Sequence, residues 1–511
     1  MRADELWIAI ASLSGGIGVG VACAVDHAGP GPGPDSEHGS SSGDVPSGDE
    51  SGAGSTEQGG DDPEDEADEP AEDDDSDSET DVGDEDDAEA ETSSDDDDGE
   101  DEHDDNDDDG DDEPLFDIGG VETGEMPDGE DLEFSYIWIA NSPEGTVSKI
   151  DTRTLIERGR YLVNPDPSHD ASAGPSRTSV SLDGDMVVID RDGGLTKVWA
   201  VSERCSDHNG TPGIQTSTDS QFLGWNGDIA EDDCIAWRLE DALPNGRAVA
   251  WTAPVTGADG EQTSPANVWA AYPTGIGGAA QVLLVSSAGA VLERVDVPDC
   301  DCPVFGPYGG AVDRDNNFWF FVRDGSPHGL GGRLFRVEYG SLSVASYERP
   351  NGTFAYGLAV DRERQVWLVG DYGSVVRFDP DSETFTHHEP PTLDSRYVLR
   401  GTMQHPSGDL FVAAMSGWDL PAVPESGIVR LRPDTGEMVD FIGASEIPEI
   451  ARPAGIAIDF DGFVWMVDTD ANRAFRIDPD THDYESVGGL VSPYTYSDMT
   501  GFGLGNVNPP E

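Results

Sequence analysis

The strongest constraint on the fold is an internal repeat in the C-terminal part of the chain. One unit, residues 455–468, has an apolar segment from Gly455 to Ile458, an Asp-rich turn, and a second apolar segment around Trp465. An alternating segment follows at 473–478, and a more polar one comes after an Asp-Pro-Asp turn. Four short strands per unit, at a period of about 45–55 residues, is the pattern of a β-propeller.

The same frame recurs along the chain, in segments that begin at residues 178, 248, 309, 357 and 401. We expect the aligned aromatic residues to pack in the core; they are Trp138, Trp269, Trp319, Trp367, Phe411 and Trp465. The first unit starts directly with its second strand at Ile137, whereas 500–504 resembles a first strand with nothing after it. Joining the two predicts an all-β, seven-bladed β-propeller that is closed by a C-terminal strand at 499–507 and has no open edge.

The segment before the repeats has a different composition. Residues 31–113 hold 41 Asp or Glu and no Lys or Arg, so this segment cannot bury enough apolar surface to fold, and we expect a disordered acidic stalk. The predicted organisation is a leader at 1–24, a disordered linker rich in Asp, Glu, Gly and Ser at 25–130, and the propeller at 131–511. Subtracting the 41 charges from the net charge of −79 still leaves −38 elsewhere, and such a field repels nucleic acid and anionic lipid. We therefore expect no nucleic-acid partner, and membrane contact only through an N-terminal anchor.

Residues 6–25 carry no charge and predict an export leader. Three kinds of processing fit it: lipidation of Cys23 in a lipoprotein box, ordinary cleavage at the small residues Ala22 and Ala24, or retention as an uncleaved anchor. The long polar tether directly after Cys23 favours the lipoprotein. We expect an exported protein of the cell envelope or cell surface, or otherwise a secreted one.

Four further cysteines are explained by export, because disulfides persist in oxidising compartments. Cys205 and Cys234 flank one long polar insertion and are the better disulfide pair. Cys300 and Cys302 either form a short bridge or remain free thiols. No His stands at metal-ligand spacing from either pair, which disfavours a metal site there.

The repeat alignment also indicates a candidate site. In a propeller blade, the start of the first strand and the end of the second lie at one face, around the mouth of the channel. Five units place Gly at the start of the first strand, where strands crowd together, but two place Arg177 and Arg247 there. The candidate ligand-binding residues of this mouth are Arg177, Arg247, Tyr308, Arg323, Tyr356, Arg400, Asp190, Asp371 and Asp468.

Two hypotheses follow from this set. Arginine offers planar, bidentate donors that suit carboxylate or phosphate, so the first is a small anionic ligand, or an acidic side chain of a protein partner, at this face. The second is structural: Arg177 and Arg247 pair with Asp190, Asp371 or Asp468, and the charges are neutralised internally.

The units GIAIDFDGFVWMVDTDANRAFRIDPDT and GLAVDRERQVWLVGDYGSVVRFDPD resemble repeats of the streptogramin B lyase-like propellers and of related NHL and gluconolactonase-type propellers, over 134–507. The resemblance implies the fold and, for the lyase, a magnesium-dependent activity with catalytic His and Glu at the channel mouth. No mouth position here is His, and His405 falls on a turn at the opposite face, so no catalytic residue is carried over. Because these repeats host many functions, we expect a non-catalytic binding module held off the cell surface by the stalk. The alternative is a lyase- or lactonase-like enzyme that uses the mouth carboxylates with a divalent cation, Ca or Mg.

Overall fold

The computed structural model describes residues 135–166, 174–240, 245–257, 261–275, 278–302, 305–323, 332–390, 393, 395–416 and 425–509. All of them belong to one compact unit, Asp112–Glu511. The predicted leader at 1–24, Cys23 and the acidic linker at 25–130 lie outside the described residues. Within the described ranges, no helix is long and apolar enough to cross a membrane.

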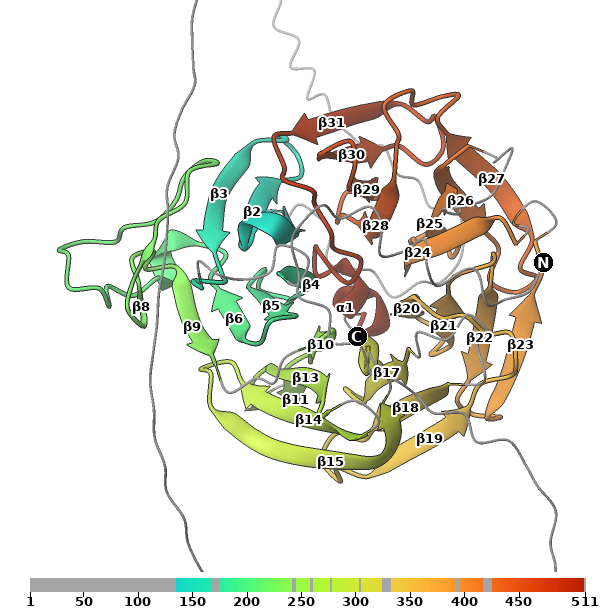
Figure 1. Cartoon of the computed structure of the whole chain (residues 1–511), viewed down its shortest axis with the longest axis horizontal. Helices are drawn as coiled ribbons and strands as arrows, with labels where there is room; N and C mark the ends of the chain where they lie inside the picture. The colour runs from blue at the N-terminus through green and yellow to red at the C-terminus, as the bar shows by residue number, and fades with distance from the viewer. Residues whose placement is uncertain are drawn as a thin grey trace, which may run out of the picture. The chain divides into compact units, whose positions relative to one another are not determined.

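The strands form small antiparallel sheets that follow one another around a ring (Figure 1). In five of these sheets the strand order is the chain order, and each sheet runs outward from the centre of the ring (Figure 1). The five sheets are β1 (Tyr136–Asn141), β2 (Thr146–Asp151) and β3 (Glu157–Leu162); β4 (Pro175–Val180), β5 (Met186–Asp190), β6 (Leu195–Val198) and β9 (Ile235–Leu239); β20 (Gly357–Val360), β21 (Val366–Val369), β22 (Val375–Asp379) and β23 (Thr384–His388); β24 (Tyr397–Gln404), β25 (Leu410–Ser416), β26 (Gly427–Leu431) and β27 (Met438–Gly443); and β28 (Pro453–Ile458), β29 (Val464–Asp468), β30 (Arg473–Ile477) and β31 (Tyr484–Gly488).

A sixth, eight-stranded sheet is made of two such units joined at their inner strands. Its halves are β10 (Ala248–Trp251), β13 (Asn267–Pro273), β14 (Gly278–Ser286) and β15 (Val291–Cys302), and β16 (Pro307–Val312), β17 (Phe318–Val322), β18 (Arg333–Val337) and β19 (Val344–Glu348). One parallel pair, Ala248 with Gly309, joins them. A Cβ on Gly310 would lie 2.5 Å from the Val249 nitrogen, so this close approach of two inner strands requires glycine.

The remaining elements are short additions to these sheets. They are the pairs β7 (Trp225–Asn226) with β8 (Ile229–Ala230) and β11 (Val255–Thr256) with β12 (Gln262–Ser264), and the 3-10 turns η2 (Ser142–Glu144) and η3 (Ser202–Arg204). The prediction of an all-β, propeller-like fold is thus confirmed. The predicted aromatic column is fully buried, as expected of residues that pack blade against blade.

The turn after the inner strand explains why Asp and Trp recur in the repeat. Asp459 accepts hydrogen bonds from the backbone N–H groups of Asp461 (3.0 Å) and Phe463 (2.9 Å), and from the Trp465 indole N–H (2.8 Å). The same indole-to-carboxylate bond, again 2.8 Å, joins Trp319 to Asp313 and Trp367 to Asp361. One buried carboxylate therefore closes the hairpin and fixes the core tryptophan beside it.

The predicted closing strand at 499–507 is wrong, because Phe502–Val507 form the helix α1. The pattern of 500–504 imitates the start of an inner strand, but Gly501 adopts a φ of 85°, which ends the extended chain. Asp498 then accepts hydrogen bonds from the N–H groups of Gly501 (2.9 Å) and Leu504 (3.0 Å), and so satisfies free donors at the helix start.

The segment just before α1, residues 493–499, closes the ring instead, and we call it the closing segment. It lies along β1, where the Trp138 N–H donates to the Met499 carbonyl at 2.9 Å and the Tyr494 N–H donates to the Ala140 carbonyl at 2.9 Å. It also contacts both neighbouring inner strands: the Thr495 and Thr178 hydroxyls are 3.4 Å apart, and the Thr500 hydroxyl just beyond it donates to the Ile458 carbonyl at 2.6 Å. The first sheet therefore obtains its inner edge from the C-terminal end of the chain.

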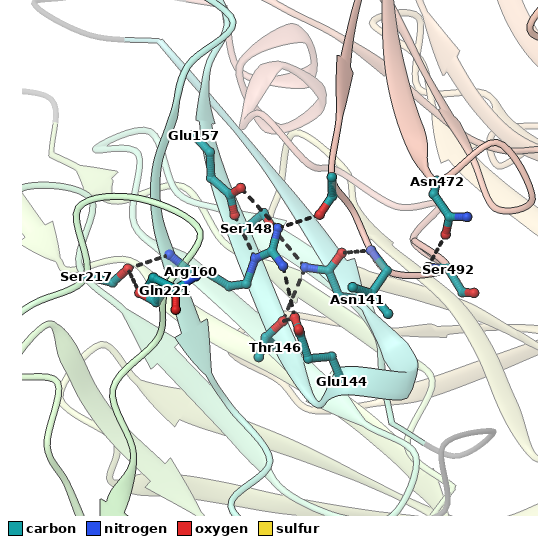
Figure 2. A network of polar contacts seen from close by, with 12 residues as sticks. Asn141, Glu144, Thr146, Ser148, Glu157, Arg160, Ser217, Gln221, Asn472 and Ser492 are labelled. Carbon is teal, nitrogen blue, oxygen red and sulfur yellow. Dashed lines mark hydrogen bonds and ion pairs between the residues drawn. The ribbon is translucent and has the colours of Figure 1, made fainter. Parts of the chain in front are cut away.

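Polar contacts further out tie the first sheet to the segment that follows β31 (Figure 2). The guanidinium of Arg160 binds Glu157 at 2.8 and 3.0 Å and donates to the Gly489 carbonyl at 2.9 Å. The Asn141 side-chain oxygen accepts a 2.9 Å bond from the Val491 N–H. These contacts join the first sheet to the C-terminal segment, where the beginning and the end of the folded chain lie side by side.

Helix α1 occupies the centre of the ring (Figure 1). Asn506 donates to Gln404 of β24 at 3.0 Å, and Phe502, Leu504 and Val507 are buried. The space left between α1 and the inner strands is about 50 Å³, which suits a few water molecules but no larger ligand. The channel is therefore plugged beneath its mouth.

Both cysteine pairs are bonded in the structure. Cys205 and Cys234, whose Cα atoms are 4.6 Å apart, close the insertion between β6 and β9. Cys300 and Cys302 form a bridge at the end of β15, with Cα atoms 5.0 Å apart.

Candidate functional site

The nine candidate residues lie at the starts of inner strands and the ends of second strands. Arg177 is in β4, Tyr308 in β16 and Arg400 in β24; Arg247 and Tyr356 directly precede β10 and β20; Asp190 and Asp468 end β5 and β29; and Arg323 and Asp371 follow β17 and β21.

Four of the inner strands carry an irregularity at this end. Their register shifts lie at Pro175/Arg177, Tyr308/Ala311, Leu399/Thr402 and Pro453/Gly455. Such bulges bend a strand and redirect its side chains, which is why they occur beside functional sites.

Three tyrosines form the centre of the site. The rings of Tyr308 and Tyr356 meet edge to face at 5.3 Å, and Tyr496 lies 5.0 Å from Tyr356. The hydroxyls of Tyr308 and Tyr496 are 2.9 Å apart, and the Tyr496 hydroxyl donates to the Tyr494 hydroxyl at 3.4 Å. Exposed fractions of 4%, 6% and 2% for Tyr308, Tyr356 and Tyr496 place all three phenols out of bulk water.

Four guanidinium groups stack on these rings. Arg177 lies 3.9 Å from the Tyr496 centroid and 4.7 Å from that of Tyr308. Arg400 lies 3.6 Å from the Tyr356 centroid. The remaining two are more distant: Arg323 is 4.5 Å from Tyr356 and 5.7 Å from Tyr308, and Arg247 is 5.8 Å from Tyr308 and 5.4 Å from Phe305. We call Arg177, Arg247, Arg323, Arg400, Tyr308, Tyr356, Tyr496 and Asp371 the Arg–Tyr cluster.

Asp371 is the carboxylate of the cluster, and it binds two of the four arginines. It accepts bonds from Arg400 at 2.8 Å and from Arg323 at 2.9 Å. Burial raises the pKa of Asp371, but the two guanidinium groups outweigh burial and hold that pKa below its usual value.

The other two arginines have no such partner. Arg177 donates to the Tyr356 carbonyl at 3.2 Å, and Arg247 donates to the Asn245 carbonyl at 3.2 Å. Among the described residues, neither guanidinium forms an ion pair with a carboxylate, although Arg177 is 1% exposed and Arg247 is 9% exposed. The hypothesis that they pair with Asp190, Asp371 or Asp468 is therefore wrong for the described part of the chain.

Asp190 and Asp468 do not join the cluster. Asp190 accepts a 2.9 Å bond from the Asp192 N–H, and burial raises its pKa to about 6. Asp468 binds the backbone N–H groups of Ala451, Arg452 and Ala471 at 2.8–2.9 Å, so it orders the loop before β28. Asp468 is structural in its contacts, whereas the second carboxylate oxygen of Asp190 is buried without a hydrogen-bond partner among the described residues.

The three buried guanidinium groups of Arg177, Arg247 and Arg400 and the half-buried one of Arg323 surround a single half-buried carboxylate, Asp371. The excess of positive charge acts on the central phenol. Burial by itself raises the pKa of Tyr308, but the charges of Arg323, Arg177 and Arg247 outweigh burial and lower that pKa to about 7. Burial raises the pKa values of Tyr356 and Tyr496. The cluster therefore favours a negative charge at its centre, on Tyr308 or on a bound group.

Tyr496 and Phe305 are members of the site's surroundings that sequence reasoning missed. Tyr496 belongs to the closing segment, which was expected to start only at 499. Tyr308 and Tyr356 stand just before the Gly of an inner strand, but Tyr496 is followed by Ser497, so an alignment on the glycines did not include it.

A divalent cation has no evident position in the described residues, among which no group of three or more His, Cys, Asp or Glu side chains converges. His405 lies between β24 and β25, where its ring contacts the Ser407 hydroxyl and the Gly462 carbonyl at 2.9 Å each. Burial lowers its pKa to about 4. As predicted, it belongs to the turn end of the ring.

A hollow of about 650 Å³ lies away from the mouth, along β9 and the insertion, and is lined by His208, Trp225, Asp228 and Trp237 among others. Its polar groups do not converge on one point: Trp225 and Trp237 donate their indole N–H to the backbone carbonyls of Leu162 (2.8 Å) and Ser287 (3.0 Å). The Arg–Tyr cluster, with its shared charges, is the stronger candidate site.

Solved structures similar to this chain include streptogramin B lyases, the family that the repeats resemble. Virginiamycin B lyase from Staphylococcus aureus is 16% identical over 63% of this chain and 88% of its own, with a TM-score of 0.40. A streptogramin B lyase structure is 16% identical over 63% and 86%, with a TM-score of 0.41. Apo AztD from Citrobacter koseri is 13% identical over 71% and 97%, with a TM-score of 0.42. No family model and no curated protein matches the chain. At these values the fold assignment rests on the sheets described above, and the function on the site.

Proposed function

We propose that this protein is a binding propeller whose Arg–Tyr cluster holds a small anionic ligand or an acidic side chain of a protein partner. The observation that carries the proposal is the charge balance: four buried or half-buried guanidinium groups surround one carboxylate. A buried charge is stable only when it is paired or hydrogen-bonded, and among the described residues the hydrogen bonds of Arg177 and Arg247 go to carbonyl oxygens and not to a carboxylate. An anion between them would supply the missing charge.

The geometry suits a planar oxyanion. The guanidinium groups lie 3.6–5.8 Å from the tyrosine ring centroids, and the N–H groups of Arg177 and Arg247 that are not bonded to carbonyl oxygens can donate to a carboxylate or phosphate. Arg323 and Asp371 retain side-chain exposures of 20% and 25%, so they mark the side from which an anion would arrive. Because the positions are held by strands and bulges, little ordering remains to oppose binding.

The proposal includes a complete ring of seven blades. The five sheets in chain order and the two halves of the eight-stranded sheet are seven units, and the closing segment, which is not a regular strand, takes the inner position of the first. We further propose, on sequence grounds alone, that the protein is exported and tethered through its leader, Cys23 and the acidic linker, which would present the mouth to external ligands.

The test is the double variant Arg177→Ala with Arg247→Ala. Calorimetry at low salt with acetate and inorganic phosphate should detect binding to the parent protein and at least a tenfold loss in the variant, since charge-assisted bonds are worth more than 1 kcal/mol each. Its stability should change little, about 1 kcal/mol, because no carboxylate is stranded and mutual repulsion is relieved.

The matched control is Arg364→Ala, which removes an exposed arginine paired with Asp315 far from the mouth and should leave anion binding intact. A destabilised double variant, together with a parent protein that binds neither anion, would end the proposal.

A further inference from the structure

Tyr308 has an unusual position within the Arg–Tyr cluster. It belongs to β16 at a bulge, and the groups that face it come from five other parts of the ring. They are Arg177 of β4, Arg247 before β10, Arg323 after β17, Tyr356 before β20 and Tyr496 of the closing segment. Three of these are guanidinium groups, and the carboxylate of the cluster, Asp371, is already bound to Arg323 and Arg400.

We propose that Tyr308 is the proton-linked counterion of the anion site: it is a phenolate when the site is empty and takes up one proton when an anion binds. This inference rests on the proposed function and deepens it. A bound anion would replace one negative charge by another beside Arg177 and Arg247, so the phenolate would lose its stabilisation and become a neutral phenol. The site would then exchange an internal counterion for an external one without a change in its net charge, which suits a compact anionic group such as a single carboxylate.

The hydroxyl contacts support both states. The bond between Tyr308 and Tyr496, 2.9 Å long, can be donated from either side. When Tyr308 is ionised, the Tyr496 hydroxyl donates to it. When Tyr308 is protonated, it donates to Tyr496, which in turn donates to Tyr494. Tyr494 is half-buried, so this row of three hydroxyls leads from the centre of the cluster toward its rim and gives the proton a path.

The electrostatics single out Tyr308 among the three central phenols. Its pKa is lowered to about 7 because Arg323, Arg177 and Arg247 outweigh its burial, whereas burial raises the pKa values of Tyr356 and Tyr496. The phenol and phenolate forms of Tyr308 are therefore close enough in free energy that a bound anion can convert the phenolate into the phenol.

Two measurements on the full chain test the inference. Calorimetry of acetate binding at pH 8, in two buffers of different ionisation enthalpy, should give about one proton taken up per anion, and the association constant should fall toward tenfold per pH unit above the phenol pKa. Ultraviolet difference spectra of the free protein should show one ionised tyrosine at this pH, which acetate removes.

In Tyr308→Phe, the proton uptake and the tyrosinate signal should both disappear, and the remaining anion affinity should no longer vary with pH. Tyr161→Phe is the control, because Tyr161 is equally buried but belongs to β3, away from the cluster; it should keep both signals.

The outcomes separate the two proposals. Anion binding without proton uptake, or with uptake that survives in Tyr308→Phe, would overturn the inference and leave the proposed function standing. Absence of anion binding at every pH, even below the phenol pKa, would overturn both.

Discussion

The two faces of the propeller, the channel mouth and the opposite face with the turns after the inner strands (the turn end), differ in how their buried charges are paired. At the turn end, Asp313, Asp361 and Asp459 each receive an indole N–H at 2.8 Å, and backbone N–H groups of the same turn complete their bonds. At the mouth, four guanidinium groups gather around tyrosine rings with one carboxylate among them. The first arrangement recurs in three of the units, whereas the second combines arginines, tyrosines and one aspartate from different positions of several units.

This difference distinguishes charged residues that stabilise the fold from charged residues that can bind a ligand. A charge that the fold needs comes with its partners in the same turn, because that turn is formed within one unit and recurs where the unit is repeated. The mouth residues break the repeat, as when Arg177 and Arg247 stand where other units have Gly, and they meet only when the ring is closed. Charges that the repeat does not pair are therefore the ones available to a ligand.

The largest expected effect comes from a deletion that alters the mouth and also opens the ring. Deleting residues 491–511 removes Tyr496 from the mouth, and it also removes the two backbone bonds of 2.9 Å that the closing segment makes with β1. Cooperative unfolding should be lost or shifted sharply downward in a thermal melt. Deletion of 509–511 is the control and should leave the melt in place. An unchanged melt in the long deletion would show that the ring does not depend on this segment.

A smaller, local loss is expected from Asp459→Ala at the turn end. The substitution leaves the Trp465 indole and the N–H groups of Asp461 and Phe463 without their acceptor in a site of 0% exposure. Each orphaned group costs about 1–3 kcal/mol, so we expect about 3 kcal/mol in denaturant unfolding, well above the effect of Arg177→Ala with Arg247→Ala. Equal losses for the two variants would remove the distinction between the ends.

The smallest effect is a dependence of stability on pH that has opposite sign for Asp459 at the turn end and for Tyr308 at the mouth. Burial raises the pKa of Asp459 to about 6, so the folded state holds that proton more tightly than the unfolded one, and stability falls as pH rises from about 4 to 6. The lowered pKa of Tyr308 has the reverse consequence, and stability rises between about pH 7 and 10.

Two variants isolate these slopes, each of which is at most about 1.4 kcal/mol per pH unit. Asp459→Asn should flatten the acid slope and Tyr308→Phe the alkaline one, in urea titrations at a series of pH values. Comparison with the parent protein is necessary, because the lowered pKa of His405 adds a rise between about pH 4 and 6.5. If stability still falls between about pH 4 and 6 in Asp459→Asn, the slope belongs to another group. One such group is Asp361, because burial also raises its pKa to about 6.

The sequence predicted what the repeat encodes. The apolar strands, the Asp turn and the tryptophan column are properties of one unit, so each copy supports the others. Alignment also placed Arg177, Arg247, Tyr308, Arg323, Tyr356, Arg400 and Asp371 at one mouth, and the structure brings these seven side chains together.

What the sequence did not predict depends on single, unrepeated contacts. The role of Asp498 in starting α1 is local, and its neighbour Gly501 imitates the glycine of an inner strand. As a result, the closing segment was placed too late in the chain and Tyr496 was missed. The separation of Asp190 and Asp468 from the cluster depends on side-chain direction at strand ends, where bulges and loops override the regular alternation of a strand.

The most direct test of the central claim is a crystal structure of the protein grown or soaked with bromide, whose anomalous scattering locates anions independently of any interpretation of the site. We expect a bromide within hydrogen-bond distance of the guanidinium groups of Arg177 and Arg247, and its loss in the Arg177→Ala, Arg247→Ala variant. Bromide bound elsewhere on the propeller, with the cluster empty and an ordered carboxylate of the chain itself between the two arginines, would contradict it.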